Sequence, residues 1–229
     1  VKTKVYRISR DAALLLKARI CLYEGTYRRY RNLEGDAEYL KLAYEAAGAL
    51  MDMGHSLYKS ATPEQSYFDL FIQDKYDTNP EVILAREYDA SINMGNNVSN
   101  SIPGAIMGMS RDCFEEYLCA TTGKPISQCG CHNPDMGQIQ EMENRDGRLL
   151  QTVCLPKAGE YSRYLFKEVN GVMTGGASSI FGLLEGTEKK PFYGTSSTGY
   201  AVAKFYKASE HAVGNHKGSI DAPVMRYAE

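Results

Sequence analysis

The chain has 229 residues and a mass of 25.5 kDa, enough for one large domain or two small ones with a core that excludes water. Hydrophobic residues make up 43% and charged residues 24%, an ordinary balance that excludes wholesale disorder and fibrous repeats. A net charge of −2 excludes a global field that attracts nucleic acid, and 17 Tyr with no Trp leave Tyr or Phe for any stacking platform.

The first quarter of the chain predicts two helices. Ser9 is a suitable N-cap, and the residues after it place apolar side chains at helical spacing, with Gly25 as the expected stop. A polar connector follows over 26–35, and a second apolar stripe runs through 37–51 and ends at Gly54. Small alanines on both stripes predict that the two helices pack closely as a hairpin.

Shorter elements are predicted further along the chain. Pro63 begins a third helix with a ring-rich face, and 81–86 is a short strand or extended segment. Ser110 caps another short helix. Gly, Ser and Thr dominate 171–199, which predicts turns and short extended pieces, whereas 221–229 has the pattern of the first two turns of an amphipathic helix.

A long irregular loop is predicted over 88–108, where Asn, Ser, Gly and Met occur without any period. Loops of this length in compact domains are usually functional or disordered. Four Asn side chains in the loop offer hydrogen-bond donors and acceptors that suit hydroxyl-rich ligands. Contact with a ligand and simple solvation both remain open at this point.

Catalytic and metal chemistry finds little support in the residue pattern. None of the four histidines stands in a recognised catalytic frame, and carboxylate pairs such as Glu141 and Glu143 fit a solvated helix face. Cys129-Gly130-Cys131-His132 could donate to a metal, but a second ligand pair is not evident. We therefore expect no catalytic residue, metal or cofactor, and idle or buried thiols or one or two disulfides among the six Cys.

The order of the segments resembles the SusD/RagB family. In that family an Ala-Leu-Lys-Ala-Arg helix runs into Leu-Tyr-Glu-Gly-Thr, as Leu16-Lys17-Ala18-Arg19 does before Leu22-Tyr23-Glu24-Gly25-Thr26, and a later helix ends in a Gly-x-Pro-Ile turn. The matching segments are, in chain order, 9–28, the second helix up to 56–58, 67–71, 79–84, 113–126, 145–149, Thr198-Gly199-Tyr200 with Lys204, and 221–223 with 226–229.

The resemblance implies a mainly α fold in which tetratricopeptide-like helical hairpins carry an irregular, loop-rich lobe with short strands. Within one SusD-like domain, repeat helices would occupy 1–76, the loop-rich lobe 77–220 and the start of a truncated repeat helix 221–229. The chain would then be about half of a family member, with the lipid-anchor Cys and the first helices before Val1.

The resemblance also implies a function: a non-enzymatic, surface-exposed outer-membrane lipoprotein that captures glycan for a SusC-like TonB-dependent transporter, without a cofactor or nucleic acid. Oligo- or polysaccharide is the expected ligand, and the lipid anchor would lie outside this chain. By order along the chain, the family's ligand-facing loops correspond to the region of the candidate ligand-binding residues Arg86, Tyr88, Asn93, Asn96 and Asn97. The alternatives are a helical-repeat module that binds a protein or peptide, and a hydrolase that uses Cys or carboxylate chemistry.

Overall fold

The computed structural model describes residues 5–102, 108–132, 141–153, 167–169, 172–174, 198, 200 and 202–229. Two compact units divide the chain, and each has its own hydrophobic cluster. Unit 1 comprises Val1–Tyr58, Gln73–Glu87 and Ile220–Glu229, and unit 2 comprises Lys59–Ile72 and Tyr88–Ser219.

These units differ from the predicted division of the chain. The predicted repeat region 1–76 contributes 59–72 to unit 2, and the predicted lobe 77–220 contributes 77–87 and 220 to unit 1. The division of one SusD-like domain into these regions stays a prediction. Most of the Gly-, Ser- and Thr-rich region 171–199 lies outside the described residues, so its predicted turns stay a prediction. The helix-rich, mainly α character is confirmed, whereas tetratricopeptide-like hairpins stay a prediction.

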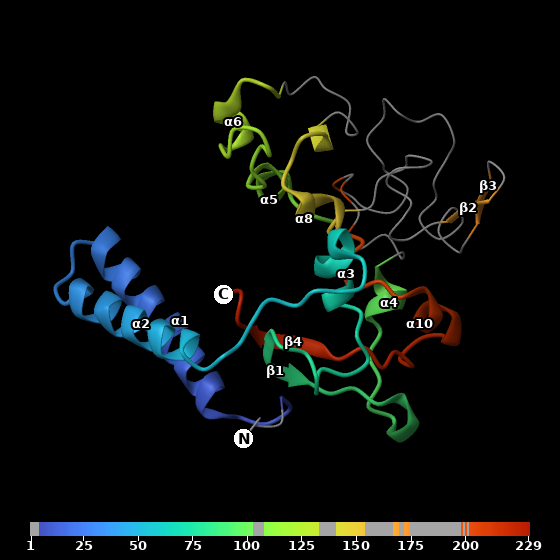
Figure 1. The fold of residues 1–229 in the computed structure, drawn as a ribbon, viewed down its shortest axis with the longest axis horizontal. Coiled ribbons are helices and arrows are strands. Elements are labelled where there is room, and N and C mark those ends of the chain that lie inside the picture. The colour runs from blue at the N-terminus through green and yellow to red at the C-terminus, as the bar shows by residue number, and fades with distance from the viewer. Residues whose placement is uncertain are drawn as a thin grey trace. The chain divides into compact units, whose positions relative to one another are not determined.

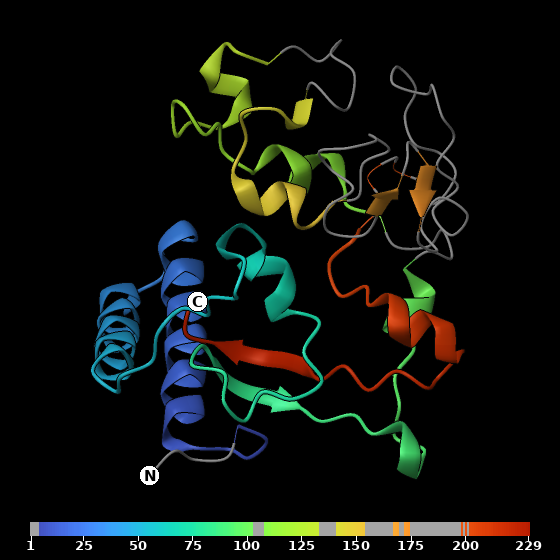
Figure 2. The ribbon, with the colours of Figure 1, turned by 45° about the vertical axis from the view of Figure 1, so that its right-hand side comes forward.

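A helical hairpin dominates unit 1, in which α1 (Arg10–Tyr30) and α2 (Asp36–Met51) lie side by side (Figures 1 and 2). The predicted N-cap is confirmed, because Ser9 Oγ accepts a hydrogen bond from Ala12 N at 3.2 Å. The predicted stop at Gly25 is wrong. Gly25 is buried within α1, where a Cβ atom would lie 2.7 Å from Leu40 Cγ, so the missing side chain allows α2 to approach.

A two-stranded antiparallel sheet pairs β1 (Val82–Arg86) with β4 (Ala222–Arg226), which lie side by side in Figure 1. The predicted strand at 81–86 is therefore confirmed, and the predicted helix at 221–229 is wrong. Residues far away in the sequence overrode the local pattern: Met225 joins Ile83 in the core, and the Arg226 guanidinium donates to buried Glu81 at 2.8 Å.

Buried polar side chains also join the parts of unit 1. The Asp221 carboxylate is 1% exposed and accepts a hydrogen bond from the Tyr6 hydroxyl, which in turn accepts one from Tyr76 N at 2.7 Å. Burial and the hydrogen bond to Asp221 raise the pKa of Tyr6. A chain of two hydrogen bonds, ending at the Asp221 carboxylate, thus links the residues before α1, before β1 and before β4.

Where the structure describes unit 2, it consists of short helical turns of three to six residues and a small hairpin (Figure 1). The predicted Ser110 cap is confirmed, because its Oγ accepts from Cys113 N at 3.2 Å. The described elements are η1 (Pro63–Gln65), α3 (Ser66–Leu70), η2 (Ala90–Ile92), α4 (Val98–Ser101), α5 (Arg111–Glu115), α6 (Ile126–Cys129), α8 (Gly147–Leu150), β2 (Lys167–Val169), β3 (Val172–Thr174) and α10 (Ala208–Val213).

Arg145 is a polar anchor in the described part of unit 2. It is 5% exposed, and its guanidinium donates to the backbone carbonyls of Phe114 at 2.7 Å, Tyr117 at 2.7 and 3.0 Å, and Glu141 at 2.9 Å. Burial lowers the pKa of Arg145. The Glu141 carboxylate in turn accepts from the Tyr200 hydroxyl at 3.0 Å. Side-chain hydrogen bonds to backbone carbonyls thus connect turns that are not joined by a β-sheet.

Among the described residues, no helix has both the length and the hydropathy required to cross a membrane.

Candidate functional site

Residues 88–102 of the irregular loop predicted over 88–108 form a closed loop in unit 2, which we call the asparagine loop, and 103–107 lie outside the described residues. Asp89 N donates to Met94 O at 3.0 Å and Met94 N returns a bond to Asp89 O at 2.9 Å. The Asp89 carboxylate also accepts from Ser91 N at 2.8 Å and begins η2. Asn93 follows η2 with a φ of 59°, in the left-handed region that Asn tolerates better than most residues. Residues 91–94 therefore form a tight, exposed tip.

The rest of the asparagine loop is fastened to a second stretch of unit 2, which we call the bracing segment (205–219). Asn96 N donates to Gly218 O at 2.8 Å, and Gly218 N donates to Asn96 O at 3.0 Å. The Asn97 side-chain oxygen accepts from His216 N at 3.0 Å, and α4 and α10 pack together (Figure 1). The loop is thus held in one conformation by backbone and amide hydrogen bonds.

The structure gives the predicted ligand-binding residues different positions. Asn93 is exposed at the tip and Tyr88 is half-buried at the start of the loop. Asn96 is 8% exposed, and its side-chain oxygen accepts from Val98 N at 3.0 Å. Asn97, half-buried, holds the bracing segment, and Arg86 is exposed at the end of β1, in unit 1. Four of the five therefore share one loop, and their role in ligand binding stays a prediction.

Two apolar side chains at the tip were missed by the sequence analysis. Ile92 is 63% exposed and Met94 is 55% exposed, and they flank Asn93. Asp89, as a turn-forming residue two positions before Ser91, was the signal that could have placed 91–94 at a turn. An exposed amide between two apolar side chains can offer hydrogen bonds and apolar contact to the same ligand.

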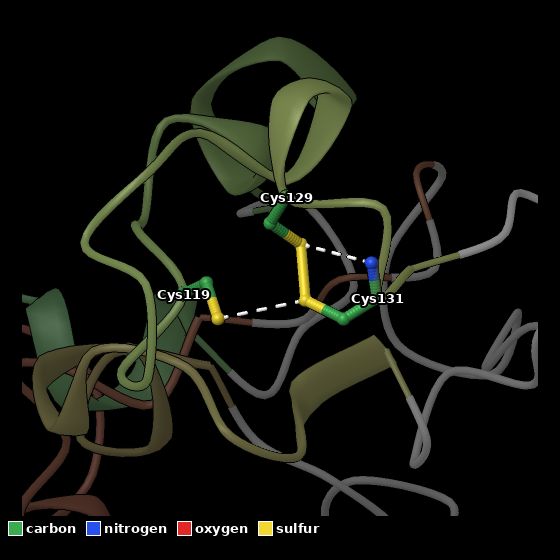
Figure 3. A group of neighbouring side chains, drawn as sticks. All are labelled: Cys119, Cys129 and Cys131. Atoms are coloured by element: carbon green, nitrogen blue, oxygen red, sulfur yellow. Dashed lines mark hydrogen bonds between the residues drawn. A yellow bond between two sulfur atoms is a disulfide. The ribbon is translucent and has the colours of Figure 1, made fainter.

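A cluster of sulfur atoms lies elsewhere in unit 2 (Figure 3). Cys129 and Cys131 form a disulfide, and buried Cys119 places its Sγ 3.5 Å from Cys131 Sγ. His132 Nδ1 lies 3.2 Å from Cys129 Sγ and 3.4 Å from Cys131 Sγ. The sequence analysis missed Cys119 because it precedes Cys129 by a turn at 121–125 and by most of α6, at whose last residue Cys129 lies.

Comparison with known proteins agrees with the resemblance of the sequence. The model of the SusD family matches residues 80–229, a span that contains β1, the asparagine loop, the sulfur cluster and β4. No curated protein and no solved structure shows a significant match. Members of this family bind glycans in nutrient uptake, work with TonB-dependent transporters and are generally non-catalytic outer-membrane lipoproteins. Because the matched span is more than half of the chain, this chain belongs to the SusD family.

Proposed function

We propose that this chain captures oligo- or polysaccharide at the cell surface and delivers it, chemically unaltered, to a SusC-like TonB-dependent outer-membrane transporter. The observation that carries the proposal is the family match over 80–229, because that span includes the asparagine loop. The proposal includes an outer-membrane location through a lipid anchor. It also assigns the α1/α2 hairpin to a tetratricopeptide-like scaffold.

The exposed chemistry of the asparagine loop supports glycan as the ligand. Sugars present apolar ring faces beside hydroxyl edges, so a site for them combines flat or apolar side chains with amide donors and acceptors. Tyr88, Asn93 and the two apolar neighbours of Asn93 provide that combination. In the proposal Tyr88 and Asn93 contact the glycan, whereas Asn96 and Asn97 position the loop. Arg86, which belongs to unit 1, stays a separate candidate for glycan contact.

The bracing segment supports the proposal energetically. A loop that is ordered before the ligand arrives loses less conformational entropy on binding than a mobile one. Asn97 and the backbone of Asn96 fix the loop to residues 216–218, more than 100 positions later in the chain. A shallow site can therefore bind a polymer without a deep pocket.

Affinity electrophoresis and calorimetry against a panel of polysaccharides test the proposal on the full chain. At least one polysaccharide should retard the protein, and Tyr88→Ala should weaken its binding by about tenfold, the loss expected for one ring contact. Tyr30→Ala, at an exposed tyrosine on α1, is the matched control and should leave the affinity unchanged. Failure of every polysaccharide to bind, or turnover of one by the pure protein, would reject the proposal.

One observation favours a second candidate, the binding of a peptide. An apolar groove of about 530 Å³ lies along the α1/α2 hairpin in unit 1. Its lining includes Leu15, Leu22, Leu40, Tyr44, Met51 and Tyr227. Such grooves accept the apolar face of an amphipathic helix. Leu22→Glu would then abolish binding of amphipathic helical peptides, whereas the glycan proposal predicts unchanged polysaccharide affinity for this variant.

A further inference from the structure

The sulfur cluster brings together four side chains that can act as metal ligands. Cys119, Cys129 and Cys131 place their three sulfur atoms within 4.8 Å of one another, and His132 Nδ1 lies against two of them. Three sulfurs and one imidazole form a ligand set typical of structural zinc sites. We propose that, when the Cys129–Cys131 disulfide is reduced, these four residues bind one Zn²⁺ ion.

Three of the ligand–ligand distances in the cluster are close to those of a tetrahedral site. Zinc–sulfur bonds of about 2.3 Å and zinc–nitrogen bonds of about 2.0–2.1 Å imply ligand separations of about 3.8 Å between sulfurs and about 3.5 Å between sulfur and nitrogen. Cys119 Sγ and Cys131 Sγ are 3.5 Å apart, and His132 Nδ1 is 3.2 and 3.4 Å from its two sulfur neighbours. To complete the site, the bonded sulfurs of Cys129 and Cys131 must separate, and the His132 ring must move closer to Cys119, because only the three cysteine sulfurs all lie within 4.8 Å of one another.

The backbone around the cluster is already arranged for convergence. Gly130 adopts a φ of 67°, a left-handed conformation that a glycine reaches without strain, and so turns the chain between Cys129 and Cys131. Cys119 is held from the other side, because its backbone N donates to Lys124 O at 2.9 Å. Two segments that meet at the cluster are thus fixed independently of any ion.

Hydrogen-bond donors also point at the sulfur atoms. Cys131 N donates to Cys129 Sγ at 3.3 Å, and Asn144 Nδ2 donates to Cys119 Sγ at 3.5 Å (Figure 3 draws the first of these). Donors of this kind offset the negative charge of metal-bound thiolates and orient them. Sulfur and imidazole ligands together favour zinc over the hard cations Ca²⁺ and Mg²⁺.

Conversion of the disulfide form into the zinc-bound form requires a reductant, and an external dithiol supplies the electrons and protons. The dithiol transfers two electrons and two protons to the Cys129–Cys131 disulfide and becomes a disulfide itself. Three thiols then each release a proton as they bind Zn²⁺, and His132 contributes a ring-nitrogen lone pair without releasing one. Disulfide and zinc therefore exclude each other, and the site does not depend on the proposed glycan function.

Zinc binding by the full chain tests the proposal. The chain is reduced with a dithiol, desalted under nitrogen and mixed with Zn²⁺ alone, and the bound metal is counted by native mass spectrometry. We expect one Zn²⁺ per chain after reduction and none while the disulfide is intact. Reduced protein that retains no zinc, or oxidised protein that binds it equally well, overturns the proposal.

Zinc binding by single-residue variants tests which side chains are ligands. Cys119→Ser and His132→Ala should each weaken zinc binding by at least about tenfold, since even residues that only support ligands contribute tenfold or more. Cys113→Ser is the matched control, because Cys113 is exposed and outside the cluster, and it should bind zinc as the parent does.

The absorption spectrum of a Co²⁺-loaded sample reports on the metal ligands and so distinguishes the loss of a ligand from misfolding. The reduced parent should show the thiolate-to-metal charge-transfer band and the intense visible bands of tetrahedral cobalt. Cys119→Ser, checked for an unchanged thermal transition in its oxidised form, should show a weaker charge-transfer band. An identical cobalt spectrum in parent and Cys119→Ser removes Cys119 from the site and contradicts the proposal.

Discussion

The α1/α2 hairpin and unit 2 are ordered by different kinds of interaction. In the hairpin, small buried residues such as Gly25, Ala43 and Ala46 allow two long helices to pack along their apolar stripes. In unit 2, single side chains such as Arg145 and Asn97 bind the backbone of distant turns. When packing is spread over many residues, the loss of one contact changes the free energy of unfolding little. When one buried polar side chain holds several turns, its removal should destabilise all of them.

The largest effect is expected at Arg145. Arg145→Ala leaves the buried carbonyls of Phe114, Tyr117 and Glu141 without this donor and should reduce the free energy of unfolding by about 3–5 kcal/mol. Arg148→Ala is the matched control, because the Arg148 side chain is 62% exposed; it should cost less than about 1 kcal/mol. Urea unfolding of both variants measures the difference, and equal losses would contradict the polar-anchor account.

Substitutions at two glycines of the hairpin should change its stability in opposite directions. Gly25→Val should reduce stability by about 1–3 kcal/mol, because the added side chain meets Leu40. Gly48→Ala lies in α2 with no atom within 4 Å of the new Cβ and should raise stability by about 0.5–1 kcal/mol through helix propensity. Thermal unfolding monitored by circular dichroism compares them, and stabilisation by both substitutions would refute close approach at Gly25.

A smaller effect is expected at Asn97. Asn97→Ala removes the acceptor of His216 N and should cost about 1 kcal/mol. Hydrogen exchange should quicken at the His216 amide and in the asparagine loop, while amides of the α1/α2 hairpin keep their rates. Uniform quickening across both units, or none in the loop, would show that the bracing segment does not hold the loop through this side chain.

The smallest effect concerns pH. A hydrogen bond from Arg148 lowers the pKa of Asp146, so the charged pair stabilises the fold at pH values above the ordinary carboxyl range near about 4. That contribution, less than about 1 kcal/mol at a partly exposed site, is lost as pH falls through the lowered pKa. Unfolding of Asp146→Asn should therefore differ from the parent at pH 7 and converge with it in acid. A difference that widens in acid would contradict the assignment.

The sequence predicted elements whose causes are local. Ser9 and Ser110 cap helices through atoms three residues away, and the stripe of α2 lies within the helix that it describes. Gly25 misled the prediction because a glycine can end a helix or admit a neighbour, and only the position of Leu40 distinguishes the two cases.

Features that depend on distant partners could not be predicted from the sequence. β4 forms because its partner β1 lies about 140 residues earlier in the chain, a distance beyond any local pattern. The direction of each Asn side chain in the asparagine loop, and the meeting of Cys119 with Cys131, likewise depend on the folded backbone. The family resemblance led to the prediction that the loop region faces the ligand, which stays a prediction, and it did not separate exposed Asn93 from buried Asn96.

Hydrogen exchange with and without a bound polysaccharide tests most directly whether the asparagine loop is the capture site. The full chain is incubated with a polysaccharide that retards it in electrophoresis. Protection of backbone amides from exchange is then compared between the asparagine loop and the α1/α2 hairpin. We predict slower exchange at residues 90–97 and unchanged exchange along the α1/α2 groove. Protection confined to the groove, with an unaltered asparagine loop, would contradict the account.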